Sequence, residues 1–205
     1  MYGGETPVTD RAKQSPYLAE LQRRVLIYDG AMGTSLDEYT LTAEDFGGEE
    51  TNGCRDYLVL TRPDIIEQIH TSFMEAGCDV LETCTFQATR IRLEEWGIGE
   101  QTHALNFNAA QIARRVADRF EALDGRKRFV AGSIGPTGKL PSSDEPALSD
   151  ITFAQLSDIV YEQARALVEG GVDVLLMETA FDVLEVKAGL DGIRRCLQEL
   201  SLIHI

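Results

Sequence analysis

The chain has 205 residues, 43% of them hydrophobic, which is enough for one domain with a substantial core. Its formal net charge of −15 at pH 7 disfavours nucleic acid and anionic membrane surfaces as partners, because both repel an acidic protein. No apolar run approaches the roughly 20 residues that span a membrane, and the N-terminus lacks the apolar core of a signal peptide, so we expect a cytoplasmic protein.

The first half of the chain alternates strand patterns with helix patterns. A short apolar run at residues 25–28, closed by a turn, predicts the first strand. Residues 63–77 then show apolar side chains at helical spacing, with proline in the first turn and glycine at the end. Residues 78–81 predict a second strand, and the apolar stripe over residues 105–120 predicts a second, longer helix.

The same alternation continues in the second half. Residues 129–134 predict a third strand, and Thr152 is placed to cap a third helix that runs to Gly170. A fourth strand is predicted over residues 172–177 and a last helix over residues 184–200. Strands that are apolar throughout and separated by helices indicate a parallel α/β sheet.

An open doubly wound sheet and a barrel both satisfy this pattern, but the phosphate-binding glycine motifs of nucleotide-binding sheets are absent. The glycine-rich loop at residues 132–139 has the wrong spacing for one. A barrel has eight units, so four predicted βα units indicate the N-terminal half of a TIM (β/α)₈ barrel. We therefore expect an N-terminal arm at residues 1–24, a truncated barrel domain at residues 25–200 and a tail at residues 201–205 that does not continue the pattern.

Two stretches of the chain, residues 76–86 and residues 170–182, repeat each other. Each has a helix-ending glycine, an apolar strand, and then Glu-Thr at the end of the strand, with Glu82 and Glu178 as the acids. Asp29 follows the first predicted strand in the same way. The C-terminal ends of parallel strands meet at one edge, where ligands bind, so these three carboxylates should converge. They either hold a cationic group, such as a substrate amine, or cap the turns and helices that follow.

Five segments resemble the homocysteine S-methyltransferase family, in that family's order and spacing. They are residues 29–34, 52–64, 82–86, 131–137 and 177–182. Within the family, the similarity is greatest to the N-terminal homocysteine-binding domain of cobalamin-dependent methionine synthase. The resemblance implies a methyltransferase enzyme that makes methionine by moving a methyl group from methylcobalamin to the thiolate of homocysteine.

The resemblance also implies roles for particular residues. Asp29 and Glu178 would bind the ammonium group of homocysteine. Backbone N–H groups around Gly30 and Ala31 would meet its carboxylate, and Thr85 would line the pocket. None of these residues is expected to be catalytic in the sense of attacking the methyl group.

Zinc held by three cysteine thiolates binds the homocysteine sulfur in this family, which keeps the thiolate available at neutral pH. The two cysteine-containing segments that supply those ligands do not occur here, and none of the four cysteines matches them: Cys54, Cys78, Cys84 and Cys196. We therefore expect the zinc ligands to lie outside this chain and the chain alone to be inactive. The expected partners are homocysteine and the cobalamin- and folate-binding domains of a parent protein.

Two alternatives stay open. A stand-alone homocysteine methyltransferase that uses betaine or S-methylmethionine would share the barrel and the zinc site. A non-catalytic barrel fragment would explain the missing ligands. The sequence of the parent reading frame beyond Ile205 would distinguish these alternatives, because folate- and cobalamin-binding domains accompany only the cobalamin-dependent type.

Overall fold

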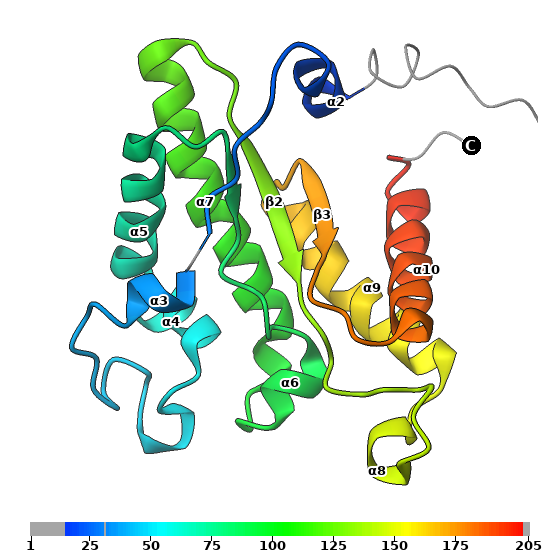
Figure 1. The fold of residues 1–205 in the computed structure, drawn as a ribbon. Coiled ribbons are helices and arrows are strands. Elements are labelled where there is room, and N and C mark those ends of the chain that lie inside the picture. Colours follow the sequence, from blue (N-terminus) through cyan, green and yellow to red (C-terminus); the bar gives the residue numbers. More distant parts are fainter. Residues whose placement is uncertain (1–14, 31, 203–205) are drawn as a thin grey trace, which may run out of the picture.

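The computed structural model describes residues 15–30 and 32–202, and it has an α/β fold (Figure 1). Three parallel strands, β1 (Val80–Glu82), β2 (Phe129–Ile134) and β3 (Val174–Met177), form one sheet in the order β1-β2-β3. The long helices are α5 (Pro63–Ala76), α7 (Thr102–Asp124), α9 (Phe153–Gly170) and α10 (Val183–Glu199). Shorter helices are α2 (Pro16–Leu21), α3 (Met32–Leu36), α4 (Leu58–Thr61), α6 (Arg90–Glu94) and α8 (Pro146–Ser149), with single 3₁₀ turns at Glu49–Thr51, Arg55–Tyr57 and Gly99–Gln101.

The predicted long helices are confirmed, and their ends follow from local chemistry. Gly77 and Gly125 take the left-handed conformation that ends α5 and α7, with φ of 101° and 72°. Thr152 and Gln155 form a reciprocal capping box at the start of α9. No helix in the described part of the chain is long and apolar enough to cross a membrane.

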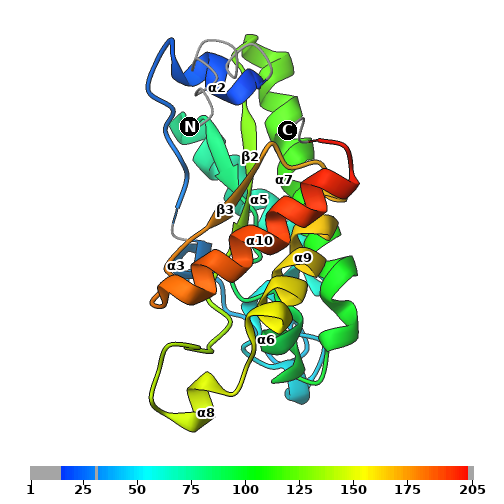
Figure 2. The same ribbon diagram turned by 90° about the vertical axis from the view of Figure 1, so that its right-hand side faces the viewer.

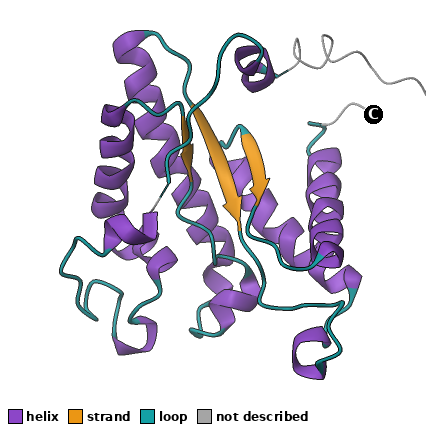
Figure 3. Cartoon of the chain, viewed as in Figure 1, coloured by secondary structure: helices purple, strands orange, loops and turns teal. Residues whose placement is uncertain are grey.

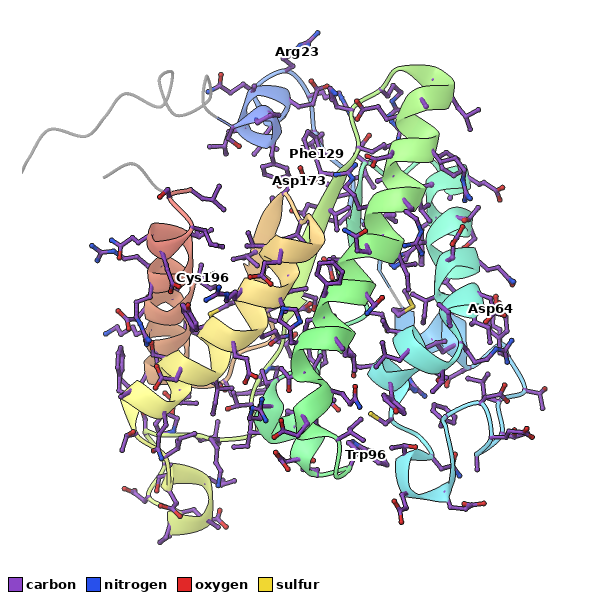
Figure 4. All side chains as sticks on the ribbon, turned by 180° about the vertical axis from the view of Figure 1, so that it is seen from behind. Arg23, Asp64, Trp96, Phe129, Asp173 and Cys196 are labelled. Atoms are coloured by element: carbon purple, nitrogen blue, oxygen red, sulfur yellow. The ribbon has the colours of Figure 1, made fainter. Side chains whose placement is uncertain are left out.

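The helices cover one face of the sheet. Views from opposite sides show α5, α7 and α9 behind the strands in Figure 1 and in front of them in Figure 4, and Figure 2 shows α10 beside α9. Leu81, Val130 and Leu175 point toward this helical layer and join its apolar clusters. Side chains alternate along a strand, so the neighbouring residues of each strand point to the other face.

The prediction of a first strand at residues 25–28 is wrong. Among the described residues the sheet has three strands, shown as orange arrows in Figure 3, so four complete βα units are not present. The segment 25–28 contributes a single bridge between Tyr28 and Val80. The reason lies in Asp79, whose Oδ2 accepts the Ile27 N–H at 3.0 Å and takes the place of a ladder partner. The segment therefore runs beside β1 without adding a regular strand.

Asp79 and Asp173, the equivalent aspartates of the sequence repeat, stabilise the starts of neighbouring segments. Asp173 Oδ2 accepts the Val130 N–H and an Arg114 N–H, each at 2.8 Å. Figure 4 places Asp173 and Phe129 together at the N-terminal end of the sheet, with Trp96 toward the opposite end. In each repeat, one carboxylate thus stabilises the start of the strand and a second lies at the C-terminal edge of the sheet.

The pairing of Asp79 makes the stability of the fold depend on pH. Burial alone would raise the pKa of Asp79, but the Ile27 N–H and the guanidinium groups of Arg24 and Arg126, at 2.8 and 2.9 Å, lower it overall. A carboxyl whose pKa is lower in the folded than in the unfolded protein adds stability at pH values above its unfolded-state pKa. This stability is lost as the pH falls through the folded-state pKa. We expect the free energy of unfolding of the wild-type protein to decrease when the pH is lowered below about 4, which is close to the ordinary aspartate pKa.

Substituting Asp79→Asn should lower the free energy of unfolding at pH 7 and remove part of its decline in acid. Urea unfolding of both proteins at pH 7 and pH 3 gives the change in the free energy of unfolding between the two pH values. Comparing this change in the two proteins cancels the contributions of the other carboxylates. Equal pH dependence in the two proteins would show that the Asp79 ion pairs do not stabilise the fold.

Candidate functional site

A pocket of ≈ 530 Å³ opens at the C-terminal ends of the strands, where parallel sheets place their ligand sites. Its walls come from the loop after residue 28, the 3₁₀ turn at residues 55–57, the loop after β1 and the ends of β2 and β3. The lining residues are Asp29, Gly30, Met32, Gly33, Gly53, Cys54, Arg55, Asp56, Glu82, Thr83, Cys84, Thr85, Phe86, Gln87, Trp96, Ser133 and Glu178.

Three carboxylates meet on one side of this pocket. Asp29 follows the bridge residue Tyr28, Glu82 ends β1 and Glu178 follows β3. Asp29 is tied to the β1 end in two ways: its N–H donates to the Val80 carbonyl, and its Oδ1 accepts the Glu82 N–H, both at 2.9 Å. The main chain therefore fixes the position of one carboxylate oxygen of Asp29.

Glu82 lies close enough to both other acids to feel their charges. Burial, followed by the negative charges of Glu178 and Asp29, raises the pKa of its carboxyl to about 7. Three carboxylates that share a partly desolvated pocket repel one another, so a cation placed between them relieves that repulsion. The arrangement suits a ligand ammonium group.

A hydrogen-bond network holds the end of β2 and orients Glu178. The Ser133 hydroxyl donates to Glu178 Oε1 at 2.6 Å, and the Ser133 N–H donates to the Thr83 hydroxyl at 3.0 Å. The Thr85 hydroxyl donates to the Ser133 carbonyl at 2.7 Å, and the Gln163 amide donates to the Thr85 carbonyl at 2.9 Å. Thr179, next to Glu178, has a φ of 54°, a left-handed conformation that is uncommon for a β-branched residue.

The other side of the pocket carries thiols and apolar groups. Burial raises the pKa of the Cys54 thiol to about 11 and that of Cys84 well above its ordinary value. Burial also raises the pKa of Asp56 to about 6. Trp96 and Met32 complete this side and pack against the main apolar core. Both thiols are therefore neutral near pH 7 and form part of the wall.

The predicted site residues lie as follows. Asp29, Gly30, Thr85 and Glu178 all line the pocket, whereas Ala31 lies outside the described residues. Thr85 is fully buried, with its hydroxyl committed to the Ser133 carbonyl. The predicted convergence of Asp29, Glu82 and Glu178 is thus present in the structure, while their roles toward a ligand stay predictions.

Sequence reasoning missed His70 and undervalued Ser133. The His70 side chain is completely buried in the structure, and its Nδ1 lies 3.8 Å from Asp29 Oδ2. One signal was available, because His70 follows Ile66 by four residues and so shares the buried face of α5. No comparable signal pointed to the bond between Ser133 and Glu178, since it joins two residues that are 45 positions apart in the sequence.

The homocysteine S-methyltransferase family matches residues 26–203 of this sequence. The chain belongs to this family. Its α/β fold with a small parallel sheet matches part of a solved homocysteine methyltransferase, MmuM from Escherichia coli. The metallated form of MmuM has 22% sequence identity and a TM-score of 0.71, over 91% of this chain and 64% of MmuM.

The oxidised form of MmuM gives a similar result, with 22% identity and a TM-score of 0.72 over 91% of this chain and 63% of MmuM. The apo form gives 21% identity and a TM-score of 0.65, over 91% of this chain and 60% of MmuM. This chain therefore spans less than two thirds of the length of MmuM. At this level of sequence identity, the similarity to MmuM shows the fold alone.

The family resemblance implies zinc, but the described residues do not fit a zinc site. Between residues 15 and 202, Ala31 excepted, no three His, Cys, Asp or Glu side chains lie together so as to hold a metal ion. Cys54 and Cys84 both line the pocket, but among the described residues no third ligand joins them in a metal-binding group.

We predict that the purified chain holds no stoichiometric zinc, because tight zinc sites need three or four deprotonated ligands. The chain would be incubated with zinc, desalted and analysed for metal by mass spectrometry. One zinc per chain that is lost in Cys54→Ser or Cys84→Ser would contradict this prediction, and Cys196→Ser, outside the pocket, serves as the control.

Proposed function

We propose that this chain forms the homocysteine-binding part of a methyltransferase that makes methionine by methyl transfer from methylcobalamin to the homocysteine thiolate. The observation that carries the proposal is the group of three carboxylates at one end of the parallel strands, Asp29, Glu82 and Glu178, in a pocket large enough for an amino acid. Membership of the homocysteine S-methyltransferase family supports the choice of ligand.

In this proposal, Asp29 and Glu178 bind the ammonium group. Glu178 Oε1 is held by the Ser133 hydroxyl at 2.6 Å, whereas its Oε2 has a longer contact, 3.5 Å from the Thr179 hydroxyl, and faces the ligand in this proposal. Gly30 and Ala31 offer backbone N–H groups to the ligand carboxylate, and Thr85 shapes the wall between the two acids. The side of the pocket with Met32 and Trp96 accommodates the aliphatic part of homocysteine.

Zinc and methylcobalamin enter the proposal through the resemblance to the family. Zinc would supply a stabilised homocysteine thiolate, and cobalamin would carry the methyl group. The described residues do not provide the zinc ligands, so the residues of this chain bind and orient the amino acid end of the substrate. Cobalamin- and folate-binding domains of a parent protein would be the partners.

The proposal is tested by comparing two ligands. Isothermal titration calorimetry of the chain with homocysteine and with 4-mercaptobutanoate, which lacks the amine, measures the contribution of the carboxylates. Homocysteine should bind more tightly by roughly tenfold or more, the effect of one charge-assisted hydrogen bond. Equal affinity for the two ligands would show that the acidic side of the pocket does not bind the amine.

A stand-alone homocysteine methyltransferase is the second candidate, because the matched solved structures are of a homocysteine methyltransferase, MmuM. The parent reading frame distinguishes the two. Its product would be assayed for methionine formation from homocysteine with methylcobalamin, betaine or S-methylmethionine. Activity with methylcobalamin supports the first proposal, and activity with only one of the other donors supports the second.

A further inference from the structure

We propose that His70 is a positioning residue, which holds the Oδ2 atom of the Asp29 carboxylate so that Asp29 presents a fixed group to the ligand ammonium. This inference rests on the proposed function, in which Asp29 binds that ammonium. His70 lies on α5 beneath the pocket and is not among the residues that line it. Its effect on the ligand would therefore pass through Asp29.

The geometry of the pair carries the inference. The His70 side chain is 0% exposed and that of Asp29 is 4% exposed, and 3.8 Å separates His70 Nδ1 from Asp29 Oδ2. Oδ1 of the same carboxylate already accepts the Glu82 N–H at 2.9 Å. The two oxygens of Asp29 thus face two different partners, the main chain of β1 and the imidazole of α5.

The imidazole has no competing partner among the described residues. Both His70 nitrogens are buried and lack a hydrogen-bond partner. A buried donor without a partner costs about 1–3 kcal/mol, so a buried histidine normally faces an acceptor. Asp29 Oδ2 is that acceptor, and a closure of about 1 Å would bring the pair to ordinary hydrogen-bond distance.

The charges around Asp29 explain why such support is needed. Glu82 and Glu178 share the pocket with Asp29, and like charges in one pocket repel one another. His70 is the one basic side chain in the described part of the chain within ion-pair distance of Asp29. A donor on Oδ2 restricts the rotation of the carboxylate, and a fixed acceptor strengthens a bond to an ammonium group.

The test compares His70→Leu, which keeps the volume and removes the donor, with His70→Asn, whose amide can replace Nδ1–H. Homocysteine and 4-mercaptobutanoate are titrated into each full-length chain by calorimetry. We expect His70→Leu to weaken homocysteine binding roughly tenfold, the loss of one hydrogen bond to a charged group, with little change for 4-mercaptobutanoate. His70→Asn should restore most of the affinity for homocysteine. His103→Leu, on the exposed face of α7, should leave the affinity for both ligands unchanged.

An equal loss for both ligands would assign His70 a purely structural role, and no loss for homocysteine would also overturn the inference. If Asp29→Ala itself leaves homocysteine binding unchanged, the role of Asp29 in the proposed function fails, and the role of His70 fails with it. If Asp29→Ala weakens binding and His70→Leu does not, only the role of His70 fails. Should His70→Leu not fold, the ¹⁵N signal of His70 Nδ1 in the wild-type chain replaces it: a shift on adding homocysteine but not 4-mercaptobutanoate is expected, and its absence would overturn the inference.

Discussion

Alanine in place of Asp29 or Glu178 is expected to weaken homocysteine binding by about 1–3 kcal/mol, the cost of losing a charge-assisted hydrogen bond. Both side chains line the acidic side of the pocket, and each already has one oxygen held in place, by the Glu82 N–H or by the Ser133 hydroxyl. Such fixed carboxylates lose little conformational entropy when they bind an ammonium group. Calorimetric titration of each variant with homocysteine measures the change in Kd.

Glu100→Ala is the matched control, because Glu100 is an exposed carboxylate outside the pocket lining. Its removal should leave the Kd unchanged. Asp29 also links the segment before α3 to the end of β1, so the free energy of unfolding of every variant has to be measured together with the Kd. Unchanged homocysteine affinity in both Asp29→Ala and Glu178→Ala, with both proteins folded, would refute the assignment of the amine-binding pair.

Gly192→Ala is expected to destabilise the fold by about 1–3 kcal/mol, or more if the helices cannot separate. At Gly192, helix α10 meets helix α9 backbone to backbone: an added Cβ would lie 2.3 Å from the Ser157 carbonyl oxygen and 2.9 Å from the Tyr161 nitrogen. Neither atom can rotate away, so the helices would have to separate and open the apolar layer between them. Thermal unfolding followed by circular dichroism should show a Tm lower by several degrees for a domain of this size.

Gly189→Ala is the control for this effect, in the same helix and with the same substitution. The nearest atoms there belong to the flexible end of the Met177 side chain, at 2.3 and 2.4 Å from the added Cβ, and this side chain can move. The gain in helix propensity from glycine to alanine is the same at both positions. A Gly192→Ala protein as stable as the Gly189→Ala protein would show that the backbone contact between α9 and α10 is not tight.

Much of the architecture could be predicted from local pattern. The limits of β2 and the ends of α5 and α9 agree with the predicted ones, because glycine stops, a threonine cap and 3.6-residue periodicity act within a few residues of each other. Helix α7 extends beyond the predicted stripe at residues 105–120 on both sides. The repeated Glu-Thr at the ends of β1 and β3 also placed two carboxylates at one edge, since parallel strands share the direction in which their chains leave the sheet.

The amino-acid sequence by itself therefore determined the helices, the strand cores and the edge at which the acids gather. Only the tertiary structure decided that the segment at residues 25–28 forms one bridge, because Asp79 binds the Ile27 N–H from 52 residues away. Likewise, only tertiary packing placed His70 against Asp29, 41 positions apart in the sequence. Hydrogen bonds and burial between distant segments depend on how the sheet and helices pack, and no local periodicity records that packing.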